Sequence, residues 1–248
     1  MSKGKQPQQL THICPEYFLG QIFIMDRFNP SLLEKLECES KSSGKNTIRT
    51  SPISQGEKLG GEFHIIMQQI GLGLPVEPFL KAYPQLGKWV EVLLPFIEIP
   101  GNKQWNAEAQ YLYNSQLVHA NYDLIIYQDQ QVIGLDWTIQ KPSNFQSLEN
   151  SFHTQLRLFL LYEKNQFTAD KVNLIYLFVN TANVYQFTYS EEKHIAFKER
   201  LLSIITQFAV EEIQQEVEQE SLEITHHKWM NREITTKEYL DAIPEVEL

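Results

Sequence analysis

Two aspartates stand in apolar surroundings, in neighbouring segments that have the pattern of β-strands. Asp123 lies in "ANYDLIIY" (120–127), and Asp136 ends the apolar run "VIGL" (132–135). Carboxylates rarely occupy such positions unless a partner offsets the cost of removing them from water. If the two segments pair as a hairpin around residues 128–131, the acids face each other with Cβ atoms roughly 5 Å apart. Two carboxylates at that separation repel each other unless a cation lies between them, and Mg²⁺ prefers such oxygen ligands.

A plainer alternative stays open for these acids. Each aspartate could end its strand and face solvent, as most acidic side chains in strands do. The depth of Asp136 in an apolar run favours a paired acid, and the solvent-facing interpretation is the one that a structure must exclude.

The elements that would position the acids follow from the hydrophobic pattern. Three strands are expected from about residue 107 to 139, two of them joined by the turn "YQDQQ", and two more at 171–180 and 184–190. Helical spacing is found at 10–28, 57–75, 83–97, 146–165 and about 191–218, with one more short helix after residue 75. This order predicts an α/β fold: a central mixed sheet of about five strands flanked by helices, with a long C-terminal helix.

Individual residues support these assignments. Two of the expected helices carry an apolar stripe, formed by Leu59, Phe63, Ile66, Met67 and Ile70 in the first and by Leu148, Phe152, Leu156, Phe159 and Leu160 in the second. Ser190 is a suitable N-cap for the last helix, because its hydroxyl can accept from a free backbone N–H. The polar stretch 37–58, rich in Ser, predicts a surface loop or a mobile segment.

Charge is unevenly distributed along the chain. Residues 191–248 contain 14 acids and 6 bases, whereas residues 1–190 contain 17 acids and 15 bases. The first three quarters are therefore nearly neutral, and no basic patch of the kind that binds phosphate backbones is present. The acidic stretch "EEIQQEVEQE" (211–220) could mimic DNA or bind a basic protein partner, although a solvated helix face is its simplest interpretation.

The hydropathy of the chain and the spacing of its cysteines indicate its cellular location. No run of about 18 apolar residues appears, which predicts no membrane span, and no signal peptide is recognisable, so we expect a cytoplasmic protein. Cys14 and Cys38 have neither zinc-ligand spacing nor a disulfide framework. They are expected to be reduced thiols.

Five segments, in this order, resemble the RecB-type branch of the PD-(D/E)XK nuclease superfamily: "LTHICPEYFLGQIF", "LGGEFH", "ANYDLII", "GLDWTI" and "HTQLRLFLLYE". The resemblance extends from about residue 10 to about 210. It suggests a nuclease-fold domain at 10–222, followed by an acidic segment at 223–248.

The resemblance implies a metal site and a reaction. Mg²⁺ or Mn²⁺ would be held by His64, Asp123, Asp136 and the carbonyl of Trp137, with Gln155 contributed by the following helix. DNA would be the substrate, hydrolysed at its phosphodiester bonds, because a metal so bound polarises the phosphate and activates water. Gln155 could equally cap a strand carbonyl.

The chain departs from the family at the position two residues after Asp136. Active members have a lysine there, and this chain has Thr138. Lys141 is five residues away from Asp136 with odd spacing, and Arg157 lies two positions from Gln155 on a helix, so neither is expected at the site. Two interpretations remain open: an active nuclease, or a catalytically silent descendant that binds nucleic acid or a protein as a scaffold.

Two further residues, Phe159 and Glu108, bear on the resemblance. Phe159 stands where the family usually has tyrosine, so a phenolic contact is missing. Glu108 on the preceding strand is either a further acidic ligand or, more simply, a solvated strand residue.

Overall fold

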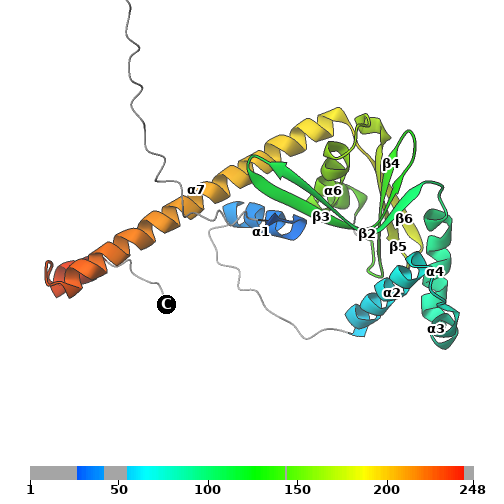
Figure 1. Cartoon of the computed structure of the whole chain (residues 1–248), viewed down its shortest axis with the longest axis horizontal. Coiled ribbons are helices and arrows are strands. Elements are labelled where there is room, and N and C mark those ends of the chain that lie inside the picture. Colours follow the sequence, from blue (N-terminus) through cyan, green and yellow to red (C-terminus); the bar gives the residue numbers. More distant parts are fainter. Residues whose placement is uncertain (1–26, 42–54, 143, 243–248) are drawn as a thin grey trace, which may run out of the picture.

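The computed structural model describes residues 27–41, 55–142 and 144–242 (Figure 1). Its elements, in chain order, are β1 (Arg27–Phe28), α1 (Pro30–Lys41), α2 (Gln55–Gly71), α3 (Glu77–Ala82), α4 (Pro84–Ile97), β2 (Asn102–Tyr113), β3 (Gln116–Tyr127), β4 (Val132–Thr138), α5 (Phe145–Asn150), α6 (Phe152–Glu163), a 3₁₀ turn (Ala169–Lys171), β5 (Val172–Phe178), β6 (Asn183–Thr188), α7 (Glu191–Met230) and α8 (Thr236–Asp241). The predicted α/β fold with a mixed sheet is confirmed.

The sheet has six strands in the described residues, one more than the sequence predicts. Their order is β1-β3-β4-β5-β6, with β2 also paired to β3. The pairings of β1 with β3 and of β4 with β5 are parallel, and the others are antiparallel. The additional strand β1 has only two residues, too few to show a period. It lies at the end of the helix expected at 10–28, and the rest of that helix is outside the described residues.

The sheet has an opening along one edge of β3, between the residues that pair with β1 and those that pair with β4. β2 pairs along the whole of β3 on one edge. The opposite edge is shared: β1 pairs with Leu117 and Val118, and β4 pairs with residues 124–127. Within the described part of the chain, no strand covers this edge of β3 at residues 119–123. The backbone groups exposed there need other partners, since buried peptide groups are rarely left unsatisfied.

Two apolar layers cover the two faces of the sheet. On β5, Leu174 and Tyr176 belong to one layer, whereas Ile175 and Leu177 belong to the other, as the alternation of a strand requires. The first layer is completed by residues of α6, α1 and α7, and the second by residues of α2 and α4. Any group at the opening in the sheet can therefore be approached from α6 on one side and from α2 on the other.

Several boundaries differ from the sequence expectations. The helix expected at 146–165 is divided at Ser151, whose hydroxyl accepts from the Thr154 N–H and caps α6. The expected loop at 37–58 overlaps the end of α1 and the start of α2, and its centre lies outside the described residues. The expected N-cap Ser190 is confirmed, because its side chain accepts from the Lys193 N–H.

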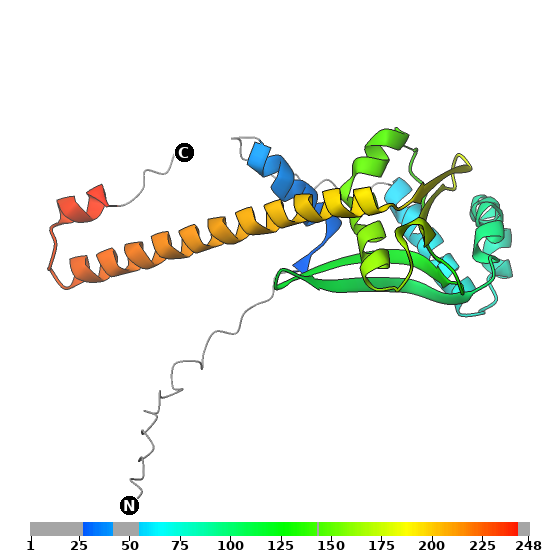
Figure 2. The same cartoon turned by 90° about the horizontal axis from the view of Figure 1, so that it is seen from above.

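Helix α7 is longer than predicted and ends at Met230. Its first half lies against the body, whereas its second half extends away from the sheet and ends beside α8 (Figure 2). It passes residue 222 without a break, and the division of the chain there stays a prediction. Among the described residues, no helix combines the length and the apolar character needed to cross a bilayer.

Candidate functional site at the opening of the sheet

The two aspartates are brought together where β4 leaves β3. The β3–β4 ladder ends where Leu124 lies opposite Leu135, and the same register continued by one residue sets Asp123 against Asp136, as the sequence predicts. Asp123 Oδ2 accepts a hydrogen bond of 2.8 Å from the backbone N–H of Trp137. This bond ties the end of β4 to β3 through a side chain rather than through the strand ladder.

The strand pair is irregular at this point. Tyr122 packs in the first apolar layer and Leu124 in the second, although two residues along a regular strand share a face. On β2, Asn106 lies opposite Asp123 and has a φ of 47°, in the left-handed region that Asn tolerates better than most residues. Its side-chain oxygen accepts from Gln68 Nε2 on α2 at 3.2 Å. The irregularity lets groups from both layers reach the acids.

His64 approaches from α2. Its Nδ1 lies 3.0 Å from Asp123 Oδ1, and its side chain is 42% exposed. The hydrogen bond to Asp123 raises the pKa of His64 above 6.5, against the opposing effect of burial. A Cβ at Gly60 would lie 3.3 Å from Ile139, so this glycine allows close approach of the helix, whereas Gly61 faces open space. Of the two adjacent glycines, Gly60 is therefore the one that the close approach of α2 requires.

Arg157 approaches from α6, and the expectation that it faces elsewhere is wrong. Its Nη2 lies 3.2 Å from Asp136 Oδ1, and its Nε donates to the carbonyl of Asn121 at 2.8 Å. That carbonyl belongs to the stretch of β3 that has no strand on the β4 side, so the guanidinium satisfies a backbone group that the opening exposes.

Gln155 faces away from the acids. Its Oε1 accepts from Nη1 of Arg200 on α7 at 2.7 Å. Residues two apart on a helix point in directions that differ by about 200°. Because α6 presents Arg157 to the sheet, it turns Gln155 toward α7.

The environment of Asp136 favours its neutral form. Burial raises the pKa of this carboxyl to about 6, and the charge of Asp123 adds to the rise, whereas Arg157 and His64 oppose it. A side chain that is only 22% exposed gains little solvation as an anion. The proximity of a second carboxylate is the arrangement that a bound cation would relieve.

A pocket of about 360 Å³ lies at the opening. It is lined by Asn106, Glu108, Asn121, Tyr122, Asp123, Asp136 and Arg157. Glu108 is held by His119 Nδ1 at 3.0 Å and by Arg27 Nη2 at 3.1 Å. Glu108 is thus partly exposed and ion-paired at the rim of the pocket, whereas the sequence suggested a residue that contacts only solvent.

Thr138 and Lys141 do not line this pocket. The Thr138 hydroxyl accepts from the Gln140 N–H at 3.2 Å, and Lys141 is exposed beyond the end of β4. The carbonyl of Trp137 stays a predicted ligand.

The donors fit a divalent metal in type. Asp123, Asp136 and His64 supply carboxylate oxygens and an imidazole nitrogen, a set suited to Mn²⁺ and, through the oxygens, to Mg²⁺. Over residues 27–41, 55–142 and 144–242, however, no group of three or more His, Cys, Asp or Glu side chains is arranged to hold a metal ion. Metal binding would require His64 and Arg157 to release part of their contacts with the acids.

Sequence reasoning placed Arg157 away from the site, and it did not single out Asn106, Asn121 or Tyr122, which also line the pocket. For Arg157 the sequence did contain an indication, because Arg157 is a single charged residue within the apolar run "LRLFLL" at 156–161. A charge surrounded by buried residues needs a partner, and Asp136 is that partner.

Comparisons with known proteins do not identify the chain. No protein-family model matches it, and no curated protein matches it. Solved structures do match, and one of them, described as "Crystal structure of SSO0001", has 14% sequence identity and a TM-score of 0.30 over 71% of this chain and 84% of that one. A similarity this low supports no inference about fold or function.

Proposed function

We propose that the protein is a divalent-metal-dependent nuclease that hydrolyses DNA phosphodiester bonds at the opening of the sheet. The observation that carries the proposal is the juxtaposition of Asp123 and Asp136, which line one pocket from adjacent strands, with His64 bonded to Asp123. Partly buried carboxylates placed side by side repel each other, a cation relieves the repulsion, and such arrangements are concentrated at functional sites.

The acidic residues, the histidine and the amides of the site would have different roles. Asp123, Asp136 and His64 would hold Mg²⁺ or Mn²⁺, which when bound polarises the phosphate and lowers the pKa of water. Asp123 is oriented by the Trp137 N–H. The amide side chains of Asn106 and Asn121 line the pocket and offer neutral hydrogen-bonding groups to the substrate. The near-neutral composition of residues 1–190 favours such polar contacts over a broad basic surface.

The proposal is tested by cleavage of single- and double-stranded DNA with Mg²⁺ or Mn²⁺. The parent is expected to cleave at least one substrate, and Asp136→Ala to lose at least a hundredfold in rate. Asp129→Ala, which alters an exposed acid in the β3–β4 turn, is the matched control and should cleave like the parent. An inert parent with both metals, or an Asp136→Ala variant as active as the parent, would reject the proposal.

A second candidate function is a catalytically silent module that binds a partner protein. Two observations favour it: Arg157 already supplies a positive charge to Asp136, and α7 carries an unoccupied apolar stripe. The stripe consists of exposed apolar residues that recur on one side of the helix, namely Ile195, Leu202, Val210, Ile213 and Ile224.

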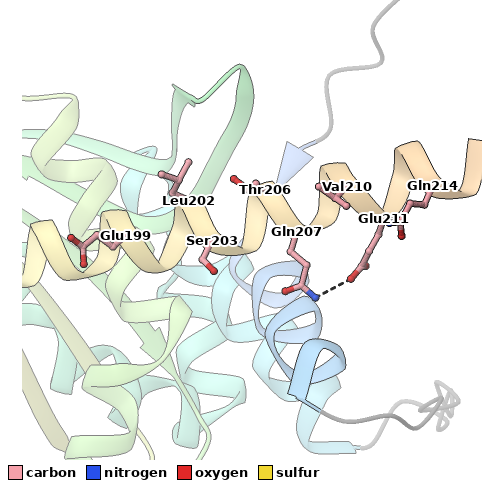
Figure 3. A pocket seen from close by; sticks show the side chains of 8 residues that line it. All are labelled: Glu199, Leu202, Ser203, Thr206, Gln207, Val210, Glu211 and Gln214. Carbon is pink, nitrogen blue, oxygen red and sulfur yellow. Dashed lines mark hydrogen bonds between the residues drawn. The ribbon is translucent and has the colours of Figure 1, made fainter.

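An open surface pocket of about 660 Å³ lies along residues 199–214 of α7 (Figure 3). Leu202, Thr206 and Val210 contribute to its lining, together with the acids Glu199 and Glu211. Residues 211–223 contain six glutamates and no lysine or arginine. An apolar stripe flanked by Glu199 and Glu211 suits a basic amphipathic helix, which would pack its apolar side along it.

The second candidate is tested with a fluorescent 21-residue helical peptide of leucine and lysine, compared with its leucine and glutamate counterpart. The basic peptide should bind, the acidic one should not, and Val210→Glu should weaken binding at least tenfold. Ile65→Glu, at an exposed apolar position of α2, is the control. Equal binding of both peptides, or equal loss in the two variants, would reject this surface.

A further inference from the structure

We propose that Arg157 is a catalytic residue of this site and supplies the positive charge that Thr138 cannot. The inference rests on the proposed nuclease function and assigns a role within it. Arg157 lines the pocket, reaches it from α6, and contacts Asp136. In the resembled family the positive charge comes instead from a lysine on the strand of the second aspartate, which here is β4.

The guanidinium is held on three sides. Nε donates to the Asn121 carbonyl at 2.8 Å, and Nη1 donates to the Tyr176 hydroxyl at 2.9 Å and to the His153 carbonyl at 3.4 Å. Nη2 donates to Asp136 Oδ1 at 3.2 Å. A guanidinium has five N–H groups, and these contacts use four. The second N–H of Nη2 has no partner among the described residues, so the group closest to Asp136 retains a free donor.

The backbone of Arg157 is also anchored at the pocket. The hydroxyl of Tyr122, another lining residue, donates to the Arg157 carbonyl at 2.6 Å. The side chain of Arg157 is only 12% exposed, so its position does not depend on solvent. The bonds to Asn121, Tyr176 and His153 do not involve the acids, so they would still hold the guanidinium if a metal took over Asp136. A donor held in this way needs little reorganisation during the reaction, which is the condition under which such a group stabilises a transition state most.

Among the residues that the structure describes, the rest of the site contains no equivalent group. Thr138 is uncharged and bonds the Gln140 N–H, and Lys141 lies beyond the strand end. His64 is directed at Asp123 through Nδ1. Of the residues that line the pocket, Arg157 is the one with a fixed positive charge.

The role follows from the charge that develops in hydrolysis. Water forms one P–O bond, the ester P–O bond breaks, one proton of the water ends on the leaving oxygen, and the other remains on the new phosphate monoester until it ionises. Arg157 neither gains nor loses a proton. Its free N–H would bind a non-bridging phosphate oxygen, on which negative charge increases in the transition state.

The test compares single-turnover cleavage by Arg157→Met, Arg157→Lys and the double variant Arg157→Met/Thr138→Lys in Mn²⁺, with the Mn²⁺ affinity of each protein measured separately. We expect Arg157→Met to cleave about 10²–10³-fold more slowly while binding Mn²⁺ at least as tightly as the parent, because the arginine no longer competes for Asp136. Arg157→Lys should retain part of the activity, and the double variant should recover activity relative to Arg157→Met. Arg200→Met, which removes another partly buried arginine away from the pocket, is the control.

The outcomes separate this inference from the proposed function. If the parent is active and Arg157→Met cleaves equally well, the role of Arg157 is rejected and the nuclease function stands. If the parent is inert, both are rejected. If Mn²⁺ binds only after Arg157 is removed, the arginine occupies the place of the metal, and the role is again rejected. Should Arg157→Met not fold, Arg157→Gln replaces it, because its amide can still donate to the Asn121 carbonyl.

Discussion

Replacing Asp136 by asparagine should stabilise the protein at neutral pH. Burial raises the pKa of Asp136 from 3.8 to about 6, so the folded state binds this proton more tightly than the unfolded state does. Between these two values the folded protein carries more protons, and the free energy of unfolding therefore falls as the pH rises. Above about pH 6 the free energy of unfolding has lost the whole contribution of the protonated Asp136.

The magnitude follows from the shift. One pKa unit corresponds to about 1.4 kcal/mol, so the ionised Asp136 costs the folded state up to about 3 kcal/mol. The effect of Arg157 is already contained in this value, because the pKa reflects its attraction for the anion. Since the side chain of Asp136 is 22% exposed, solvent screening makes this figure an upper bound.

The assay is urea denaturation of the parent and of Asp136→Asn at pH 4, 5, 6 and 7.5, without metal. The difference in the free energy of unfolding should be near zero at pH 4 and should grow to between about 1 and 3 kcal/mol in favour of the variant at pH 7.5. Asp129→Asn, in the exposed turn, should show no such trend. A variant that is less stable than the parent at pH 7.5 would show that the Arg157 contact outweighs burial, and would refute this reasoning.

Three other predictions concern the same region. Millimolar Mn²⁺ or Mg²⁺ should raise the melting temperature of the parent and not that of Asp136→Ala, since a ligand of the folded state stabilises it; an unchanged parent curve would contradict metal binding. The raised pKa of His64 means that its contribution is present below about pH 6.5 and is lost as the pH rises through the folded-state value, so His64→Gln should lower the melting temperature at pH 5.5 more than at pH 8.5; equal losses would contradict the ion pair. Gly134→Ala should lower the free energy of unfolding by about 1–3 kcal/mol in urea, because its Cβ would lie 3.0 Å from both Tyr122 and Leu161; a neutral result would show that these side chains can move apart.

Much of the fold and half of the site could be predicted from the sequence alone. The alternation of apolar residues and the turn at 127–131 specify the β3–β4 hairpin, and its register sets Asp123 opposite Asp136. The register can be read from the sequence, because a shift by one residue would turn every apolar side chain of the strand to the wrong face of the sheet. The same holds for α2, whose apolar stripe directs His64 toward the sheet beside Phe63 and Met67.

The rotation of α6 was decided only by tertiary packing. Leu156, Leu158, Phe159, Leu160 and Leu161 are all buried. The stripe predicted through Leu156, Phe159 and Leu160 is therefore only part of a wider apolar surface. Because this surface covers most of the circumference of the helix, periodicity could not decide whether Gln155 or Arg157 faces the acids. Packing against α7 and the sheet decides it, with Arg200 binding Gln155 and Asp136 binding Arg157.

The opening of the sheet is likewise a property of the tertiary structure. It arises because β1 and β4 share one edge of β3 and leave residues 119–123 uncovered, a consequence of pairing between segments far apart in the chain. β1 has two residues and no readable period, and the left-handed Asn106 has no signature in its neighbours. The sequence therefore determined which acids meet, whereas the assembled layers determined that the meeting point is an open pocket with an arginine in its wall.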